Sequence, residues 1–169
     1  CVRLAMSHLE SASPSAADLL KLCAFVDADL LPIWVLAEAA PTLPRRLERV
    51  VDDAIGFART RRILERFGFV TGSFDAVSWS RDVQAAVRDA MSDDEERHWA
   101  SQALAMVAGA FPWDPARPPL WKTCAELVAH VRAVLDHAAR LNVDAEVRDD
   151  LTQRMNTWLT LREQSMHAV

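Results

Sequence analysis

The stretch Leu64–Met91 reads LERFGFVTGSFDAVSWSRDVQAAVRDAM, and it decides the fold of this chain. Gly68 suits the position just after a helix end, because a left-handed backbone costs little without a Cβ. Aromatic and β-branched residues then flank Gly72-Ser73, which predicts a β-hairpin, and an apolar helical stripe follows from Asp82. Helix, two-stranded wing and helix are typical of the end of a winged-helix domain. There is no other β-signal, so we expect this hairpin to hold all of the β-structure.

The composition is that of an ordinary globular protein. The 169 residues are 51% hydrophobic and 25% charged, enough for one large domain or two small ones. The net charge of −5 argues against a general nucleic-acid binder, which normally has a basic surface. The three cysteines, Cys1, Cys23 and Cys124, form no CxxC pair. The last two lie on apolar stripes, which indicates buried thiols and a reduced, cytoplasmic setting.

The chain shows no targeting or membrane-spanning segment. Its best apolar run, Leu30–Ala40, is interrupted by Pro32 and Glu38 and is too short to cross a bilayer. We therefore expect a cytoplasmic protein without membrane contact. Because the sequence begins at Cys1 already in helical register, we expect it to be a segment of a longer protein.

Apolar periodicity and capping residues predict helices on both sides of the hairpin. Before it we expect helices over residues 2–10, 15–26, 32–40 and 44–67, the last with a break near 52–56. Ser13 is the expected N-cap of the second helix, with Pro14 at its first position. Pro32 is expected to open the third helix.

After the hairpin, Ser92 and Glu95 form a capping box that starts a helix to about Phe111. The proline-rich residues 112–119 are expected to be a loop. Residues 120–141 have the cleanest helical periodicity, Asn142 ends that helix, and a last helix starts near Asp144. An exposed apolar patch at Trp158 and Leu159 of this last helix would allow self-association.

We therefore predict an all-α protein with one small β-hairpin, in which a winged helix is followed by antiparallel helical hairpins. Residues 1–11 would end a preceding helical segment, and residues 12–91 would form the winged-helix domain. Residues 92–141 would form a helical connector. Residues 142–169 would be the first helix of a tetratricopeptide-like array.

Five blocks of sequence, in this order, carry a resemblance to a known family. They are LLKLCAFVDADLLPIWVL (19–36), ILERFGFV (63–70), VSWSRDVQAAVRD (77–89), EERHWASQALAMVAGAFP (95–112) and ELVAHVRAVLDHA (126–138). From about Leu4 to Leu161 the chain resembles bacterial STAND NTPases of the NB-ARC type in pattern and order. In that family a P-loop ATPase domain is followed by a winged helix, a helical connector and tetratricopeptide repeats.

The resemblance implies a regulatory segment whose partners are the upstream NTPase domain and the downstream repeats of its own parent protein. Nucleotide on the NTPase domain would lock a closed state, and a signal on the repeats would release it. ATP or ADP is thus implied as a cofactor of the parent protein only. The chain has no GxxxxGK[ST] motif and only four glycines, so we expect no enzymatic activity from it alone.

The junction between the wing and the next helix can be compared with the family. Members commonly carry an apolar residue, a histidine and a polar residue there, and the histidine contacts the nucleotide phosphate. The matching residues are Trp79, Ser80 and Arg81, so a serine replaces the histidine. By resemblance, Ser80 and Arg81 are candidate nucleotide-binding residues of the parent protein. From the residues alone, we favour Ser80 as the cap of the helix that starts near Asp82.

Histidines offer little evidence for a metal site. His130 and His137 are seven residues apart and share a helix face, with Glu126 one turn before His130. A structural zinc ion requires three or four ligands, so we expect packing roles and no bound metal.

Arginines are concentrated between residues 45 and 66, and they support an alternative function. In a DNA-binding winged helix, the helix before the wing enters the major groove. Here that helix, residues 54–67, contains Arg59, Arg61, Arg62 and Arg66. The alternative is therefore a DNA-binding transcriptional regulator. The acidic chain and the family, whose winged helix packs on neighbouring domains, favour protein contacts over nucleic acid.

Overall fold

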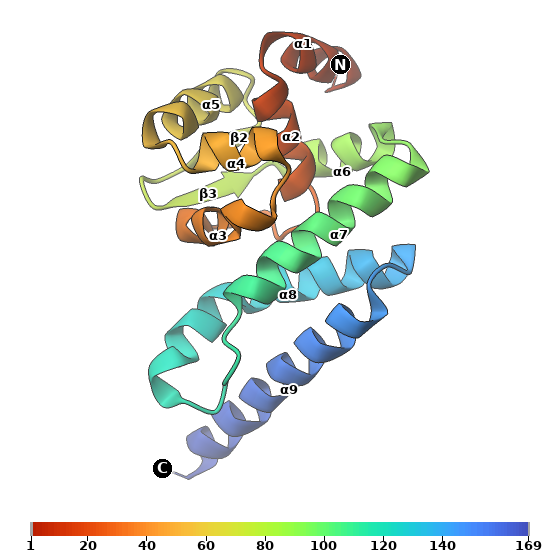
Figure 1. Cartoon of the computed structure of the whole chain (residues 1–169). Helices are drawn as coiled ribbons and strands as arrows, with labels where there is room; N and C mark the ends of the chain where they lie inside the picture. Colours follow the sequence, from red (N-terminus) through yellow and green to blue (C-terminus); the bar gives the residue numbers. More distant parts are fainter. Residues whose placement is uncertain (1, 169) are drawn as a thin grey trace.

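Helices form most of the computed structural model, which describes residues 2–168 of the chain (Figure 1). The two terminal residues lie outside this range, and with them the predicted helical register of Cys1. The described helices are α1 Val2–Ala12, α2 Pro14–Cys23, α3 Ile33–Ala39, α4 Arg45–Val51, α5 Ala54–Arg66, α6 Arg81–Ala90, α7 Asp93–Ala110, α8 Trp121–Leu141 and α9 Ala145–His167. The strands are β1 Leu31–Pro32, β2 Val70–Gly72 and β3 Ala76–Trp79, and the 3₁₀ turns are η1 Ala40–Thr42 and η2 Pro118–Leu120.

The first half of the chain has the topology of a winged helix. A helix (α2), a strand (β1), three further helices and a hairpin follow one another, and the strand order in the sheet is β1-β3-β2. Both pairings are antiparallel, with Val70 opposite Trp79 and Leu31 opposite Val77. The predicted fold class, all-α with a small β element, is thus confirmed.

The prediction that the hairpin holds all of the β-structure is wrong, because β1 adds a third strand. Pro32 does not open a helix: it is extended, with φ −64° and ψ 135°, and α3 begins one residue later. Two backbone hydrogen bonds flank the strand, from Ile33 N to Asp75 O (2.9 Å) and from Trp79 N to Ala28 O (2.7 Å). A two-residue edge strand that contains proline has no sequence periodicity to detect.

Two glycines shape the hairpin as expected. Gly68 follows α5 in a left-handed conformation with φ +73°. Gly72 has φ +143°, and a Cβ on it would lie only 2.4 Å from the Ala76 carbonyl oxygen. The end of β2 therefore requires glycine for both conformation and space.

Side-chain caps fix several helix ends where the sequence places them. The Ser13 hydroxyl accepts a hydrogen bond from Ala16 N, with Pro14 at the first helical position. Ser92 and Glu95 form the predicted capping box at the start of α7. Asn142 ends α8 with a left-handed φ of +52°. Asp53 caps α5 and so separates it from α4, inside the predicted break.

The second half consists of α7, α8 and α9, which run back and forth along one another (Figure 1). Helix α7 also packs against α2 and α3, so one continuous core extends from Met6 to Trp158. The predicted loop over residues 112–119 is irregular up to the short turn η2. Trp158 is 1% exposed, as its place on the apolar stripe of the last helix indicates, so it does not form an exposed apolar patch. Its indole packs inward because α8 and α7 cover that face of α9.

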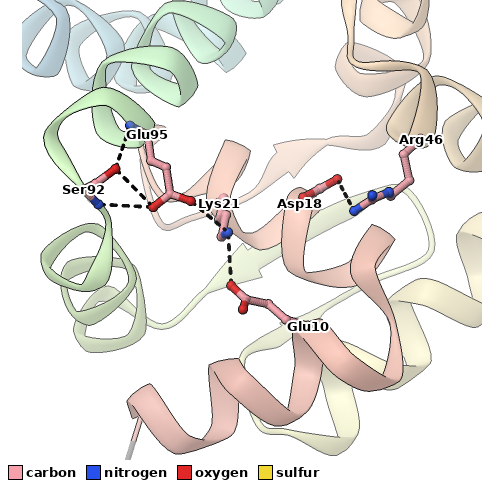
Figure 2. Close-up of polar contacts among 6 residues, drawn as sticks. All are labelled: Glu10, Asp18, Lys21, Arg46, Ser92 and Glu95. Atoms are coloured by element: carbon pink, nitrogen blue, oxygen red, sulfur yellow. Dashed lines mark hydrogen bonds and ion pairs between the residues drawn. The ribbon is translucent and has the colours of Figure 1, made fainter.

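Ion pairs connect α2 with three other helices, as Figure 2 shows. The Lys21 Nζ lies 3.1 Å from Glu10 Oε1 on α1 and 3.7 Å from Glu95 Oε1 on α7. Glu95 also belongs to the capping box, and Asp18 of α2 pairs with Arg46 of α4 at 3.4 Å. Burial raises the pKa of Asp18 despite this pairing.

Two buried polar side chains donate hydrogen bonds to backbone carbonyls at the ends of neighbouring helices. The Gln84 Nε2 of α6 donates to the carbonyls of Cys23 (2.8 Å) and Val26 (3.1 Å) at and after the end of α2. The Arg154 Nη1 of α9 donates to the carbonyls of Ala108 (3.1 Å) and Phe111 (2.8 Å) at the end of α7. These carbonyls would otherwise lack intrahelical partners.

No helix within residues 2–168 combines the length and the apolar character that a membrane crossing requires.

Candidate functional site

Ser80 serves as the cap of α6. Its hydroxyl accepts a hydrogen bond from Val83 N at 3.4 Å, and its backbone is extended, with φ −72° and ψ 124°. The capping interpretation of Ser80 is therefore confirmed.

Arg81 lies beside two carboxylates from the turn after α2. Its Nη2 is 3.4 Å from Asp29 Oδ2 and 4.0 Å from Asp27 Oδ1, and its side chain is 72% exposed. A phosphate that approached this guanidinium would have to compete with both carboxylates. The structure thus brings the second candidate nucleotide residue into contact with acidic groups of the same chain.

The arginines of α5 divide into one paired and three unpaired side chains. Arg61 is mostly buried and its Nε lies 3.0 Å from Glu65 Oε1, one turn along the helix. Arg59, Arg62 and Arg66 are exposed and form no ion pair with any residue between positions 2 and 168. These three are consequently free to contact an anionic partner.

An apolar groove lies between α3, α5 and the turn of the wing. We call it the wing groove; its volume is about 350 Å³, and it is lined by Ile33, Ala37, Val51, Asp52, Ala54, Phe57, Ala58, Arg61 and Phe74. Phe74, at the tip of the wing, is 97% exposed, and Ile55 at the start of α5 is 71% exposed. Sequence reasoning missed this site, although an aromatic residue between Ser73 and Asp75 in a polar turn was an available signal.

A second hollow lies where the wing and the Asp27–Pro32 turn face α8. We call it the acidic cavity; its volume is about 670 Å³, and it is lined by Asp27, Asp29, Leu30, Pro32, Trp34, Ser73, Asp75, Ala76, Ala125, Glu126, Ala129 and His130. Four of these residues carry carboxylates. The cavity combines residues that are far apart in sequence, so no local pattern could have revealed it.

His130 forms part of this cavity from the α8 side. The residue is 1% exposed, and its Nδ1 has no hydrogen-bond partner among the described residues. Burial lowers the pKa of His130 below its usual value, and Asp27, the Leu30 backbone and Asp29 offset this shift in part. The imidazole is therefore neutral near pH 7.

His137 has a different environment from His130. Its ring meets Phe25 edge-on, with 5.3 Å between the ring centroids, and its Nδ1 lies 3.1 Å from Arg140 Nη2. Burial, followed by the charges of Arg88 and Arg140, lowers the pKa of His137 to about 4. Within residues 2–168, no three His, Cys, Asp or Glu side chains are grouped so that they could hold a metal ion.

The two internal cysteines are buried, as predicted. Cys23 and Cys124 are both 0% exposed and unpaired. Burial raises the pKa of each thiol, so neither is activated as a thiolate nucleophile.

Comparison of the chain with protein-family models, with curated proteins and with solved structures finds no match.

Proposed function

We propose that this chain is a regulatory and interaction segment of a cytoplasmic STAND-type signalling ATPase. In this proposal the winged helix contacts the NTPase domain of the same parent protein, which binds ATP or ADP. The connector α7–α8 links the winged helix to α9, which begins a helical-repeat sensor. The observation that carries the proposal is the wing groove, an apolar hollow on the winged helix beside the exposed side chains of Phe74 and Ile55.

The chemistry of this face suits a protein partner. Protein–DNA interfaces are polar and strongly positive, whereas Phe74 and Ile55 expose aromatic and aliphatic surface beside the groove. A buried aromatic side chain removes about 150–250 Å² from water, which makes it a typical anchor of a protein interface. Both residues are on the winged helix and away from its core, so a partner could cover them without unfolding anything.

The packing of α7 supports mechanical coupling between the two halves. Helix α7 contacts α2 and α3 of the winged helix and also α8 and α9. Lys21 adds an ion pair between α2 and the start of α7. A displacement of the winged helix would therefore carry the connector and α9 with it, as a regulatory segment requires.

In this proposal, Ser80 and Arg81 make at most secondary contacts with the nucleotide. The Ser80 hydroxyl already accepts the capping hydrogen bond, and Arg81 could reach a phosphate only by leaving Asp29. The parent protein would then sense nucleotide chiefly through the position of its NTPase domain.

Binding between the chain and the upstream NTPase domain of its parent protein tests the proposal. Phe74→Ser combined with Ile55→Ser should weaken association at least about tenfold, because both side chains lose apolar contact area. Val147→Ser on α9, which also removes an exposed aliphatic side chain, is the matched control. A parent protein without a Walker motif, or equal binding by all variants, would contradict the proposal.

DNA binding by a transcriptional regulator remains the second candidate, because Arg59, Arg62 and Arg66 are exposed and have no acidic partner within residues 2–168. Titration of labelled duplex DNA by anisotropy at low salt tests this function. Salt-dependent binding that is lost on Arg59→Ala, Arg62→Ala and Arg66→Ala would establish it. Absence of binding at low salt would remove it.

A further inference from the structure

The wing groove has a basic margin along α5. Arg59, Arg62 and Arg66 follow one another on this helix at spacings of three and four residues, so they share one side of it. All three side chains are exposed, and none forms an ion pair with any residue between positions 2 and 168. We call these three side chains the basic stripe. It is a row of free positive charge on an otherwise acidic chain.

The basic stripe lies next to the groove and not on the far side of α5. Ala54, Ala58 and Arg61 line the groove, also at spacings of four and three residues. Arg59 directly follows Ala58 in the chain, and Arg62 directly follows Arg61. One residue corresponds to a turn of about 100° around a helix, so the two rows are neighbours. A partner that fills the groove therefore meets the basic stripe as well.

The local charge selects an acidic occupant. Residues 45–66 contain seven arginines and four carboxylates, although the net charge of the chain is −5. Within the groove lining, Arg61 is compensated by Glu65 at 3.0 Å. Asp52 also belongs to the lining, but it precedes α5 and lies about two helical turns from Arg59. The excess positive charge is thus on the stripe, and carboxylates opposite it would complement this charge.

The shape of the groove selects a helix as the occupant. Its lining comes from α3, the end of α4, α5 and the turn of the wing, with no strand residue among it, so a peptide cannot dock there by strand addition. Amphipathic helices instead place apolar side chains of successive turns into such hollows. Phe57 is half-buried in the groove and Phe74 is 97% exposed at its edge. These aromatic surfaces need an apolar cover, which the polar backbone of DNA does not provide.

We propose that the wing groove binds an acidic amphipathic helix. The apolar side chains of this helix fill the groove against Phe57 and Phe74, and its carboxylates lie along the basic stripe. The inference rests on the proposed function only in assigning the helix to the NTPase domain. The chemistry of the occupant follows from the groove and the basic stripe themselves.

Fluorescence anisotropy with labelled peptides and the intact chain tests this chemistry. The peptide EELLAELLEE carries leucines on one helix face with glutamates around them. KKLLAKLLKK reverses the charge on the same apolar face, and EESSAESSEE keeps the charge without that face. EELLAELLEE should bind saturably, and each control peptide should bind at least about tenfold more weakly. No saturable binding of EELLAELLEE, or equal affinity for either control peptide, would overturn the proposal.

Substitutions in the chain then locate the binding. Arg59→Gln with Arg62→Gln should weaken the binding of EELLAELLEE about tenfold, because two charge contacts are lost. Arg117→Gln with Arg132→Gln changes two exposed arginines outside the groove and should leave the affinity unchanged. Phe74→Ser should weaken the binding of EELLAELLEE and KKLLAKLLKK by the same factor, because both peptides use the same apolar contact. Equal losses from the two double variants would contradict the role of the basic stripe.

Two further outcomes separate this inference from its alternatives. Duplex DNA that binds more tightly than EELLAELLEE and displaces it would overturn the proposal in favour of a nucleic-acid surface. An NTPase domain that fails to bind the chain, while EELLAELLEE binds as described, would remove the proposed function and leave this inference standing. An NTPase domain that binds through Phe74 and Ile55, while the peptides show no charge preference, would remove this inference alone.

Discussion

Gly72 shows how one residue controls the wing. Its φ of +143° is a conformation that other L-residues avoid, and the Ala76 carbonyl oxygen occupies the position that a Cβ would need. Gly109 in α7 contrasts with it. Its backbone is helical, and a Cβ placed there would meet no described atom of a neighbouring element within 4 Å.

We expect Gly72→Ala to lower the free energy of unfolding by about 1–3 kcal/mol through backbone strain and the steric clash. Gly109→Ala should instead raise it by about 0.5–1 kcal/mol, because alanine favours the helix. Urea denaturation followed by circular dichroism measures both. Similar effects of the two substitutions would contradict the described geometry of the hairpin.

Gln84 is a buried polar residue of α6. Its side-chain amide donates hydrogen bonds to carbonyls at and after the end of α2. Gln84→Met keeps the side-chain length but leaves the carbonyls of Cys23 and Val26 without these donors. We expect a loss of about 2–4 kcal/mol in unfolding free energy. The exposed Gln153→Met on α9 is the control and should change stability by less than about 0.5 kcal/mol.

Among elements, α9 is joined to the end of α7 by one buried charged side chain. Arg154 donates to two carbonyls at the end of α7, pairs with Asp150 at 2.8 Å, and places its guanidinium 4.3 Å from the centroid of the Trp113 ring. The apolar residues Leu151 and Trp158 flank it on the buried face of the helix.

Arg154→Met should therefore lower the free energy of unfolding by about 2–4 kcal/mol, because the carbonyls of Ala108 and Phe111 lose their hydrogen-bond donor. Amide hydrogen exchange should rise first in α9 and at the end of α7. Arg132→Met, an exposed substitution on α8, serves as the comparison. Unchanged exchange in α9 would show that apolar packing alone holds this helix.

Elements with local signals were predictable from the sequence, and elements defined by distant contacts were not. Ser13, Ser92 and Asn142 carry their capping chemistry within a few residues, so the caps of α2, α7 and α8 were found correctly. Strand β1 was missed because two residues show no alternation, and its pairing depends on the distant β3. Helix α2 ends at Cys23, earlier than its apolar pattern suggests, and the distant Gln84 donates to the carbonyls of Cys23 and, beyond the helix, Val26.

Among the candidate sites too, those with a local sequence signal were predictable and those formed by distant contacts were not. The exposed arginines of α5 were visible in the sequence, and the Ser80 cap was correctly preferred. The acidic cavity and the wing groove combine residues from several elements, so their existence depends on tertiary packing. The apolar stripe of the last helix indicated a packing role for Trp158, and α7 and α8 cover that face of α9.

Across the whole molecule, His137 marks the contact between the winged helix and α8. Its ring lies against Phe25, and its pKa of about 4 reflects first burial and then the charges of Arg88 and Arg140. The unfolded chain, with an ordinary histidine pKa, binds more protons than the folded chain between about pH 4 and 6.5. Stability therefore rises with pH across this window and is lost as pH falls through it.

His137→Gln removes this titration, so its unfolding free energy should depend less steeply on pH between about 4 and 6.5 than that of the unchanged chain. His8→Gln, which replaces an exposed histidine, should keep the original slope. Urea midpoints measured at half-unit steps of pH provide the comparison. Parallel pH profiles for all three proteins would contradict the burial of His137 at this contact.

In the proposed function, the wing and α5 contact a nucleotide-dependent protein partner within one parent protein. Hydrogen–deuterium exchange of that parent protein, loaded with ADP or with a non-hydrolysable ATP analogue, tests this contact. We predict that amides over residues 54–79 exchange more slowly in the ADP-bound form, and that Phe74→Ser abolishes the difference. Identical exchange of these residues in the two nucleotide states would contradict the account.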